Sequence, residues 1–366
     1  MIGSFSRAVD NLFGRGEAAV TVPPLDGALR PNRALDEAAW RIEMPEVDCL
    51  AVLGGTLFTS VGDAIYALAA DGSRTPRRTY DARIACIANV GDDGLAVALD
   101  SGDVVIEGGP HDGGRFRIGP AVACITAMAV AGGALYVANG SATNRTDEWQ
   151  RDLLERNASG SIWRIDLDSG ASHRIADRLA WPSGLAPDAS GVVYSEAWRH
   201  RLVRIGREGA GKPAVLQSDL PGYPGRLSPS VGGWWLAVFA PRSQLVEFVL
   251  REPAYRRRMM AEVPRDYWVA PKLKSGRSYY EPLQGGGVKH LGLLKPWAPT
   301  MSFGMCVWLD AGFQPRFSLQ SRADGKTHGT TSVVEHGGAA VVAARGDGIV
   351  VRLDQPANTI GPGGVA

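Results

Sequence analysis

The chain of 366 residues has few cysteines, almost no net charge and no long apolar run, and each shortage excludes a class of protein. Four cysteines are too few for a disulfide framework at this length, and no CxxC pair or Cys/His spacing resembles a zinc site. All four lie among apolar residues in the sequence. We therefore expect reduced and buried side chains at Cys49, Cys86, Cys124 and Cys306.

The charges nearly cancel, because 39 Lys and Arg residues stand against 38 Asp and Glu residues. No global field therefore steers the protein toward nucleic acid or an anionic membrane. No stretch approaches the roughly 18 apolar residues of a membrane span. The start of the chain also lacks the basic and apolar segments of a signal peptide. We expect a cytoplasmic protein with no transmembrane segment and no nucleic-acid partner.

Three common sequence signatures of nucleotide binding or catalysis are missing as well. The chain has no G-x-x-x-x-G-K-[ST] sequence and no G-x-G-x-x-G in a βαβ setting, so nucleotide binding is unsupported. Ser183 precedes Gly184 but does not stand in a G-x-S-x-G sequence, which argues against a hydrolase with a nucleophile elbow.

Glycine and proline are abundant, with 46 and 23 residues, and many lie in turns between short apolar runs. The stretch Trp181–Ile205 shows the pattern: an apolar run, a tight Asp-Ala-Ser-Gly corner, a second run, a polar turn and a third run. Such punctuation predicts β-hairpins, because a helix of that length would not tolerate it. The same arrangement recurs along the chain, so this stretch is one repeat unit.

Six such units occur, and their corner glycines recur about every 40 residues wherever nothing is inserted, which is the period of four-stranded propeller blades. The glycines are at positions 55, 94, 133, 191, 233 and 338. Outer fourth strands are available in RTPRRTYDA, GRFRIG, ASHRIA, AVLQSD and FQPRFSLQS. In the interrupted fifth unit we expect Gln244–Leu250 to form the third strand. The sequence predicts an all-β fold, a six-bladed β-propeller with four-stranded blades.

We place the propeller at residues 34–355, after an N-terminal leader (1–33) and before a flexible C-terminal tail (356–366). In the leader, Glu17–Leu29 is an extended segment that could close the ring by pairing with the last strand. Residues 2–14 have apolar side chains near helical spacing. They predict a short helix packed on the fold, a partly disordered leader, or a peripheral contact with a membrane or a protein partner.

Two insertions interrupt the repeat, at about 141–157 and 251–300. Each contains a predicted helix, in TDEWQRDLLER and in EPAYRRRMMAEV. Long insertions in a compact domain are usually lids or binding loops, and the alternative is a strap that seals one propeller face. The longer insertion supplies Tyr267 and Trp268 as candidates to line a substrate site.

Several segments carry a resemblance to a known family. Trp181–Ile205 is close to a P-N-G-apolar strand followed by Y-x-x-E-x-W-x-x-R, and Asp219–Val238 and Thr330–Asp354 are similar to other blades of that family. Over residues 34–354 the chain resembles the strictosidine-synthase-like branch of the gluconolactonase and senescence-marker-protein superfamily. The resemblance implies a six-bladed propeller whose ligands bind in the central channel.

In such a fold the residue before each innermost strand points into the channel. Aligning the units on their corners gives Asp48, Ala85, Thr126, Ser183, Gly225 with Arg226 beside it, and Thr331. Superfamily members that hydrolyse lactones or phosphotriesters hold calcium there with Glu, Asn and Asp side chains. Here only Asp48 keeps a carboxylate, and the permanent charge of Arg226 repels a cation. We therefore expect no tightly bound calcium, and any bound ion would depend on Asp48.

Strictosidine synthase works without a metal, through a glutamate whose position here is Thr331. The candidate catalytic residues that remain are Asp48, Arg226 and His328. Arg226 and Asp48 form an ion pair across the channel, or Arg226 binds a carboxylate, phosphate or oxyanion while Asp48 or His328 moves a proton. His328 is either that titrating group or a polar surface residue.

The candidate substrate-binding residues are Thr126, Trp181, Ser183, Tyr223, Thr331, Tyr267 and Trp268. Glu196 matches the glutamate of the family pattern, and we expect it to hold its blade by pairing with Arg199 or Arg201. Our leading hypothesis is a small-molecule enzyme of the lactonase, esterase or strictosidine-synthase-like class that acts in the channel. The alternative is a non-catalytic propeller that binds a small ligand or docks a protein partner.

Overall fold

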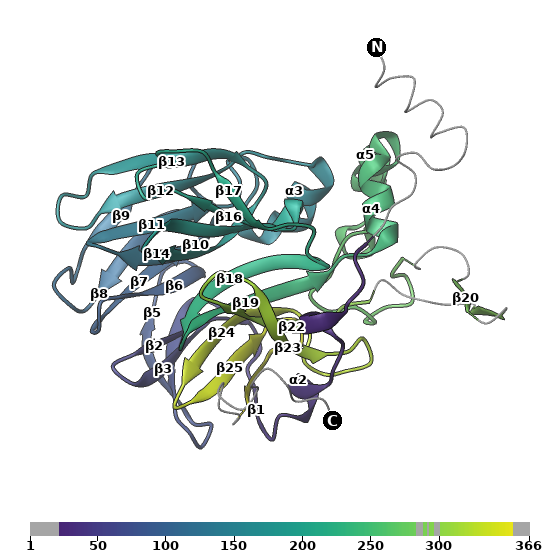
Figure 1. Cartoon of the computed structure of the whole chain (residues 1–366), viewed down its shortest axis with the longest axis horizontal. Helices are drawn as coiled ribbons and strands as arrows, with labels where there is room; N and C mark the ends of the chain where they lie inside the picture. The colour runs from purple at the N-terminus through teal and green to yellow at the C-terminus, as the bar shows by residue number, and fades with distance from the viewer. Residues whose placement is uncertain (1–21, 283–287, 291–292, 296–300, 354–366) are drawn as a thin grey trace, which may run out of the picture.

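Six four-stranded antiparallel sheets follow one another around a central channel in the computed structural model, which describes residues 22–282, 288–290, 293–295 and 301–353 (Figure 1). The colours in Figure 1 run once around the ring, and the earliest and latest strands lie side by side. The predicted fold class, a six-bladed β-propeller with four-stranded blades, is confirmed.

Each of the first four blades is formed by consecutive strands, from the innermost outward. They are β2 (Val47–Leu53), β3 (Thr56–Val61), β4 (Ala64–Leu68) and β5 (Arg74–Thr79); β6 (Ile84–Val90), β7 (Gly94–Leu99), β8 (Asp103–Glu107) and β9 (Arg115–Arg117); β10 (Ile125–Ala131), β11 (Ala134–Asn139), β12 (Gly160–Asp166) and β13 (Ser172–Leu179); and β14 (Pro182–Asp188), β15 (Gly191–Glu196), β16 (Arg201–Ile205) and β17 (Ala214–Gln217).

The last two blades contain breaks in the chain order. Blade five is β18 (Gly222–Ser230), β19 (Gly233–Pro241), β22 (Gly304–Asp310) and β23 (Pro315–Ser321), with the small hairpin of β20 (Val288–His290) and β21 (Leu293–Lys295) between its second and third strands. Blade six is β24 (Thr330–His336), β25 (Ala339–Ala344) and β26 (Ile349–Leu353), completed by β1 (Trp40–Glu43) from the start of the chain. The five predicted outer strands are the outer strands of blades one to five.

The closing strand differs from the predicted one. Of the segment Glu17–Leu29, the described part contains only a 3-10 turn, η1 (Gly27–Leu29), and the strand that pairs with β26 is β1. The apolar Trp40 and Ile42 of β1 pack beside the core between blades six and one, whereas Val22–Leu29 holds two prolines, which cannot donate to a strand ladder.

The third strand of blade five was also predicted wrongly. Gln244–Leu250 is not a strand but most of helix α4 (Gln244–Arg251), and the third strand is β22. Val246 and Val249, three residues apart, lie on one helix face and are buried against Leu154. The longer insertion therefore runs from 242 to 303, between β19 and β22.

The described helices are short and lie outside the sheets. They are α2 (Ala34–Glu37), α3 (Trp149–Glu155), α4 and α5 (Pro253–Glu262), with 3-10 turns η2 (Thr146–Glu148), η3 (Ala197–Arg199) and η4 (Arg265–Tyr267). The helices predicted in the two insertions are α3 and α5. Figure 1 shows α3, α4 and α5 gathered on one side of the molecule, where their apolar side chains share a small core. No helix in the described ranges is long and apolar enough to cross a membrane.

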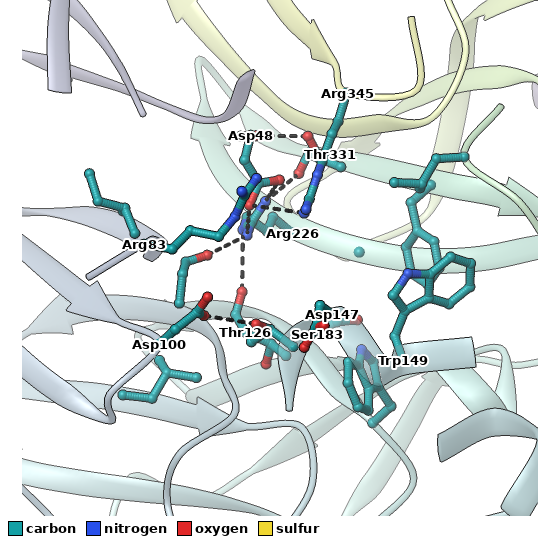
Figure 2. A pocket seen from close by; sticks show the side chains of 18 residues that line it. Asp48, Arg83, Asp100, Thr126, Asp147, Trp149, Ser183, Arg226, Thr331 and Arg345 are labelled. Atoms are coloured by element: carbon teal, nitrogen blue, oxygen red, sulfur yellow. Dashed lines mark hydrogen bonds and ion pairs between the residues drawn. The ribbon is translucent and has the colours of Figure 1, made fainter. Parts of the chain in front are cut away.

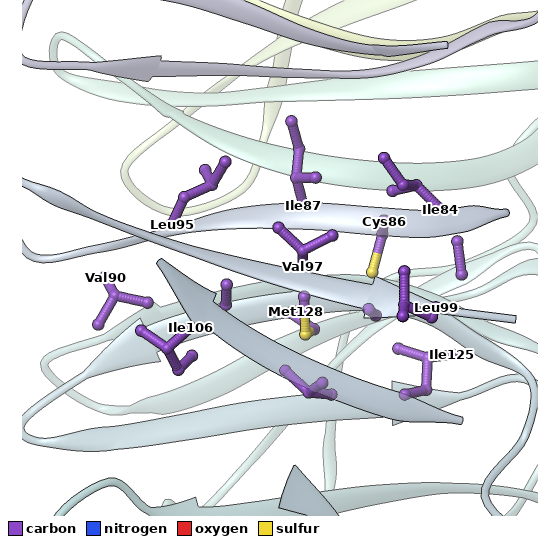
Figure 3. Close-up of a cluster of buried hydrophobic side chains, with 14 of the residues drawn as sticks. Ile84, Cys86, Ile87, Val90, Leu95, Val97, Leu99, Ile106, Ile125 and Met128 are labelled. Atoms are coloured by element: carbon purple, nitrogen blue, oxygen red, sulfur yellow. The ribbon is translucent and has the colours of Figure 1, made fainter. Parts of the chain in front are cut away.

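The main core lies between neighbouring blades, so the central strands are apolar on both faces. All six residues of β7 and all six of β25 are buried. Figure 3 shows one such layer, in which Ile87 and Val97 of blade two approach Met128 of blade three. The four cysteines are free and buried, as predicted. Burial raises the pKa of Cys49 to about 11, so its thiol stays protonated near neutral pH.

Candidate functional site

A bulge interrupts the innermost strand of every blade at the position that the repeat alignment predicts to face the channel. The pairing register shifts across Asp48, Ala85, Thr126, Ser183, Gly225–Arg226 and Thr331. A bulge leaves a residue out of the strand ladder and re-aims it. All of these residues line one pocket at the channel axis, so the repeat alignment placed them together correctly.

Arg226 lies across the channel and uses all five of its N–H donors within the protein. Its two terminal nitrogens donate to the two carboxylate oxygens of Asp48 at 3.0 Å each. The remaining donors reach backbone carbonyls of three further blades. These are the carbonyls of Ala85 at 2.9 Å, Thr126 at 3.2 Å and Thr331 at 3.2 Å.

Asp48 is held as a carboxylate by these contacts. Its burial favours the neutral acid, but the charges of Arg226 and Arg345 outweigh that effect and lower the pKa of Asp48 below its usual range. Arg345 lies 3.7 Å from one carboxylate oxygen, and the side chain of Asp48 is only 10% exposed. The ion-pair interpretation of Asp48 and Arg226 is therefore confirmed.

The ion pair divides the channel into two pockets, and among the described residues only Arg226 lines both. The upper pocket, on the side of α3, has a cavity volume of about 110 Å³ and is open to solvent, so it is smaller than the roughly 300–1,000 Å³ of most small-molecule sites. The lower pocket is lined mainly by apolar residues of the innermost strands, among them Leu50, Ile87 and Met128. A small molecule in the upper pocket would thus rest on the Asp48–Arg226 pair.

Aromatic rings form one wall of the upper pocket. They are Trp181 at the start of blade four, Phe239 on β19 and Trp149 at the start of α3. Trp198 stacks on Trp181 at 5.2 Å and lies 6.4 Å from Trp149, and its indole nitrogen donates to the buried Asp152 of α3 at 2.8 Å. This packing fixes the shorter insertion against blade four.

Charged groups of opposite sign face each other across the upper pocket. Figure 2 shows Arg83 and Arg345 beside the Asp48–Arg226 pair, with Asp100 and Asp147 on the opposite side. The carboxylate of Asp100 accepts a hydrogen bond from the Thr146 hydroxyl at 2.8 Å and makes no ion pair within the described part of the chain.

Four of the residues proposed from the sequence lie outside the lining of the upper pocket. Tyr223 is fully buried behind the aromatic wall, 5.9 Å from the ring of Phe239. Trp268 packs in the small core of α3, α4 and α5. Tyr267 lines an adjoining hollow under the longer insertion, which shares Trp149 with the upper pocket.

His328 is the fourth of these residues, and it is buried rather than on the surface. Its Nε2 lies 2.8 Å from the carbonyl of Arg322 and its Nδ1 lies 2.8 Å from the hydroxyl of Ser302. Because a carbonyl only accepts, Nε2 carries the proton and Nδ1 accepts from Ser302. Burial, followed by the charge of Lys274, lowers the pKa of His328.

The repeat alignment did not name several residues that line the upper pocket: Arg83, Asp100, Thr146, Asp147, Trp149, Phe239, Leu273 and Arg345. Arg83 precedes the innermost strand of blade two, whereas Asp100 and Arg345 follow the second strands of blades two and six. Trp149 and Leu273 arrive from the insertions, whose path the repeat pattern does not determine. Glu196 pairs with both Arg199 and Arg201, as the sequence predicted.

The residues at the axis do not fit the calcium ion that the superfamily resemblance implies. Asp48 is the one carboxylate in the ring of bulges, and the guanidinium of Arg226 already occupies the space in front of it. Within the described residues, no group of three His, Cys, Asp or Glu side chains is arranged to hold a metal ion.

Comparison with known proteins supports the resemblance seen in the sequence, although no protein-family model matches the chain. The chain is 31% identical over 108 residues to strictosidine synthase-like 13 of Arabidopsis thaliana, a match that covers 28% of this chain and 27% of the relative. It is 32% identical over 84 residues to the adipocyte plasma membrane-associated protein hemomucin of Drosophila melanogaster, covering 22% of this chain and 14% of that one. The matches thus span about a quarter or less of these relatives.

Solved structures with a similar course of the chain have low sequence identity. Regucalcin, a calcium-binding protein from Agrobacterium tumefaciens, is 14% identical with a TM-score of 0.49, covering 91% of this chain and 95% of that chain. A putative gluconolactonase is 11% identical with a TM-score of 0.48, covering 87% and 90%.

Proposed function

We propose that this chain, whose sequence resembles the strictosidine-synthase-like propellers, is a small-molecule enzyme that acts in the upper pocket without a calcium cage. Hydrolysis of an ester or lactone is the reaction that we favour within the lactonase, esterase and strictosidine-synthase-like class. The observation that carries the proposal is a carboxylate, Asp100, facing two arginines across a pocket with an aromatic wall (Figure 2).

Asp100 is better suited than Asp48 to move a proton. Both oxygens of Asp48 are engaged by Arg226 and its pKa is lowered, which makes it a weak base. The carboxylate of Asp100 accepts a hydrogen bond from Thr146 and makes no ion pair in the described part of the chain. Catalytic roles for Asp48, Arg226 and His328 remain the predictions made from the sequence, and the geometry adds Asp100 to them.

The proposed hydrolysis uses groups on both sides of the pocket. Asp100 takes a proton from a water molecule while the water oxygen attacks the carbonyl carbon of the substrate. Arg83 or Arg345 stabilises the negative charge that develops on the carbonyl oxygen. When the bond to the leaving oxygen breaks, Asp100 returns the proton to it, so the products are a carboxylic acid and an alcohol.

One observation favours the alternative, a propeller that binds a small ligand without converting it. The charged residues of the pocket floor, Asp48 and Arg226, are hydrogen-bonded to each other, so neither is available to react with a ligand. Under this alternative, Asp100, Arg83 and Arg345 only orient the ligand.

The Asp100→Asn variant separates the two functions. A panel of esters and lactones is screened for hydrolysis by the wild type, and binding is followed by the rise in melting temperature that each compound causes. If the proposal is right, D100N loses roughly 10²- to 10⁴-fold in turnover but keeps binding. The control is D103N in the same blade, where Asp103 pairs with Ser101 and Arg117 outside the pocket.

Three outcomes are distinguishable. Loss of turnover in D100N alone supports the enzyme. Hydrolysis that D100N leaves unchanged rejects Asp100 as the proton carrier. Compounds that bind the wild type and are never converted support the binding protein instead.

A further inference from the structure

We propose that Arg226 is a resident cation at the propeller axis, built into the chain in the place where the superfamily resemblance implies a metal ion. This role of Arg226 concerns stability and does not depend on the proposed hydrolysis. Its basis is the set of oxygen acceptors that the five N–H groups of Arg226 reach, and the loss of these hydrogen bonds when the side chain is removed.

The guanidinium of Arg226 connects five blades. The residue itself belongs to β18 of blade five, and its partners lie on the innermost strands of blades one, two, three and six. The acceptors are the two carboxylate oxygens of Asp48 and three backbone carbonyls. Carboxylate and carbonyl oxygens are also the ligands that calcium prefers, so one side chain satisfies a set of acceptors that otherwise suits a hard cation.

The bulges explain why these acceptors need a cation. Each bulge takes one residue out of its strand ladder, and the carbonyls of Ala85, Thr126 and Thr331 at these points accept from Arg226. Asp48 is buried beside them, and its hydroxyl-bearing neighbour Thr331 donates to its backbone carbonyl at 2.7 Å. Without Arg226, the buried carboxylate would keep only the longer contact with Arg345 at 3.7 Å, and the three carbonyls would lose their guanidinium donor, which is costly.

Arg226 also closes the channel. Because Arg226 lies between the upper and lower pockets and lines both, we expect its removal to join them into a single channel. The opening would leave Asp48 facing a space large enough for water or a hydrated ion. A calcium ion there would bind the Asp48 carboxylate directly and reach the three carbonyls through its waters.

The test compares the melting temperatures of R226A, R226K and the wild type, each with calcium chloride and with EDTA. R226A is expected to melt roughly 5–10 °C below the wild type, because it leaves a buried charge without its partner. Calcium is expected to raise the melting temperature of R226A, and this rise is expected to vanish in the double variant D48N/R226A. The control is R33A, whose partner Asp324 is exposed, and we expect little change there.

Two results would overturn the inference. One is an R226A protein as stable as R33A, which would show that the contacts across the channel hold nothing together. The other is an R226A protein that is destabilised but does not respond to calcium, which would show that the oxygens around Arg226 do not form a cation site. If R226A does not fold, R226K carries the test: a single ammonium cannot reach all five acceptors, so its melting temperature must fall below that of the wild type.

Discussion

Single buried side chains decide how the protein responds to pH, and His328 is the clearest case. Its ring is neutral, with Nε2 donating to Arg322 and Nδ1 accepting from Ser302. Protonation would place a second donor against the Ser302 hydroxyl and a positive charge near Lys274. The negative charges of Asp347 and Asp36 offset this unfavourable positive charge only in part. The folded protein therefore resists protonation of this histidine.

The lowered pKa of His328 predicts a loss of stability in mild acid. The unfolded chain takes up this proton near the ordinary histidine pKa of about 6.5, before the folded protein does. The contribution of His328 to the free energy of unfolding is therefore fully present above about pH 6.5 and is lost as the pH drops toward the pKa of the folded protein. The loss amounts to about 1.4 kcal/mol for each pH unit by which folding lowers the pKa.

His328→Gln should remove this pH dependence, because the glutamine amide can still donate through its NH2 group and accept through its carbonyl oxygen but does not titrate. Urea unfolding of the wild type and the variant between pH 5 and 8 measures the difference in free energy of unfolding. A difference that stays constant over this range would contradict the prediction.

Residue positions at the axis could be predicted from the sequence, but their contacts could not. Repeats of one blade length fix which residue of each blade faces the channel, so Asp48, Arg226 and Thr331 were placed together. Arg226 either pairs with Asp48 or stays free to bind a ligand, depending on how far its side chain extends across the channel. The spacing of the repeats does not determine this. Asp100 was missed because it follows β7, the second strand of its blade, and the alignment compared only the starts of the innermost strands.

At the scale of elements, the longer insertion is fixed to the propeller at one close backbone contact. The carbonyl of Leu273 approaches Gly329 and Gly346, and a Cβ atom added to Gly346 would lie 2.1 Å from that oxygen. Lys274, the next residue, forms an ion pair with Asp347 at 2.8 Å. Since Leu273 lines the upper pocket, this contact also sets part of the pocket wall.

Gly346→Ala should therefore displace the insertion. The added methyl group cannot fit, so we expect a loss of roughly 1–3 kcal/mol in the free energy of unfolding. Weaker binding of any upper-pocket ligand should accompany it. Gly312→Ala is the matched control, because its Cβ would meet only the tip of the Asp310 side chain, at 3.3 Å. Equal stability of the two variants would show that Leu273 does not depend on this approach.

The sequence predicted α3 and α5 but not α4, and the difference has a physical cause. The segment Gln244–Leu250 is rich in apolar residues with β propensity and stands where the repeat requires a third strand. Its buried residues, however, follow helical spacing and cover the core shared with α3 and α5. The local β propensity and the order of the repeats both favoured a strand, but the helix is the conformation that packs these residues against α3 of the other insertion.

At the scale of the whole molecule, the ring is closed by four residues. Strand β1 pairs with β26 from Trp40 opposite Arg352 to Glu43 opposite Ile349, which joins the start of the propeller to its last blade. Arg41 adds contacts outside the ladder, donating to the carbonyl of Leu35 at 3.0 Å and to the hydroxyl of Thr327 at 2.9 Å.

Breaking this pairing should destabilise the protein as a whole. Adjacent residues of a strand point their N–H groups to opposite sides, so the double variant R41P/I42P must remove a donor that faces β26. We expect a loss of about 3 kcal/mol or more in the free energy of unfolding. The control R115P/F116P breaks the outer strand β9 of blade two, where no ring closure is involved. A loss no larger than in this control would contradict the closing role of β1.

The overall architecture could be predicted because a propeller repeats one unit, so that six copies of a weak pattern reinforce each other. The strand that closes the ring could not be predicted, because it lies outside the repeats and is only four residues long. The proposed contact through residues 2–14 and the tail at 356–366 fall outside the described residues. These proposals, and the cytoplasmic location, stay predictions.

The most direct test of the account is the calcium content of the purified wild-type protein, together with its melting temperature before and after EDTA. If the Asp48–Arg226 pair forms the channel floor, calcium should be far below one ion per chain and the melting temperature should not change. An ion present at 100 times its dissociation constant would contribute about 2.7 kcal/mol, which the melt would resolve. One calcium per chain and a melting temperature lowered by EDTA would contradict the account.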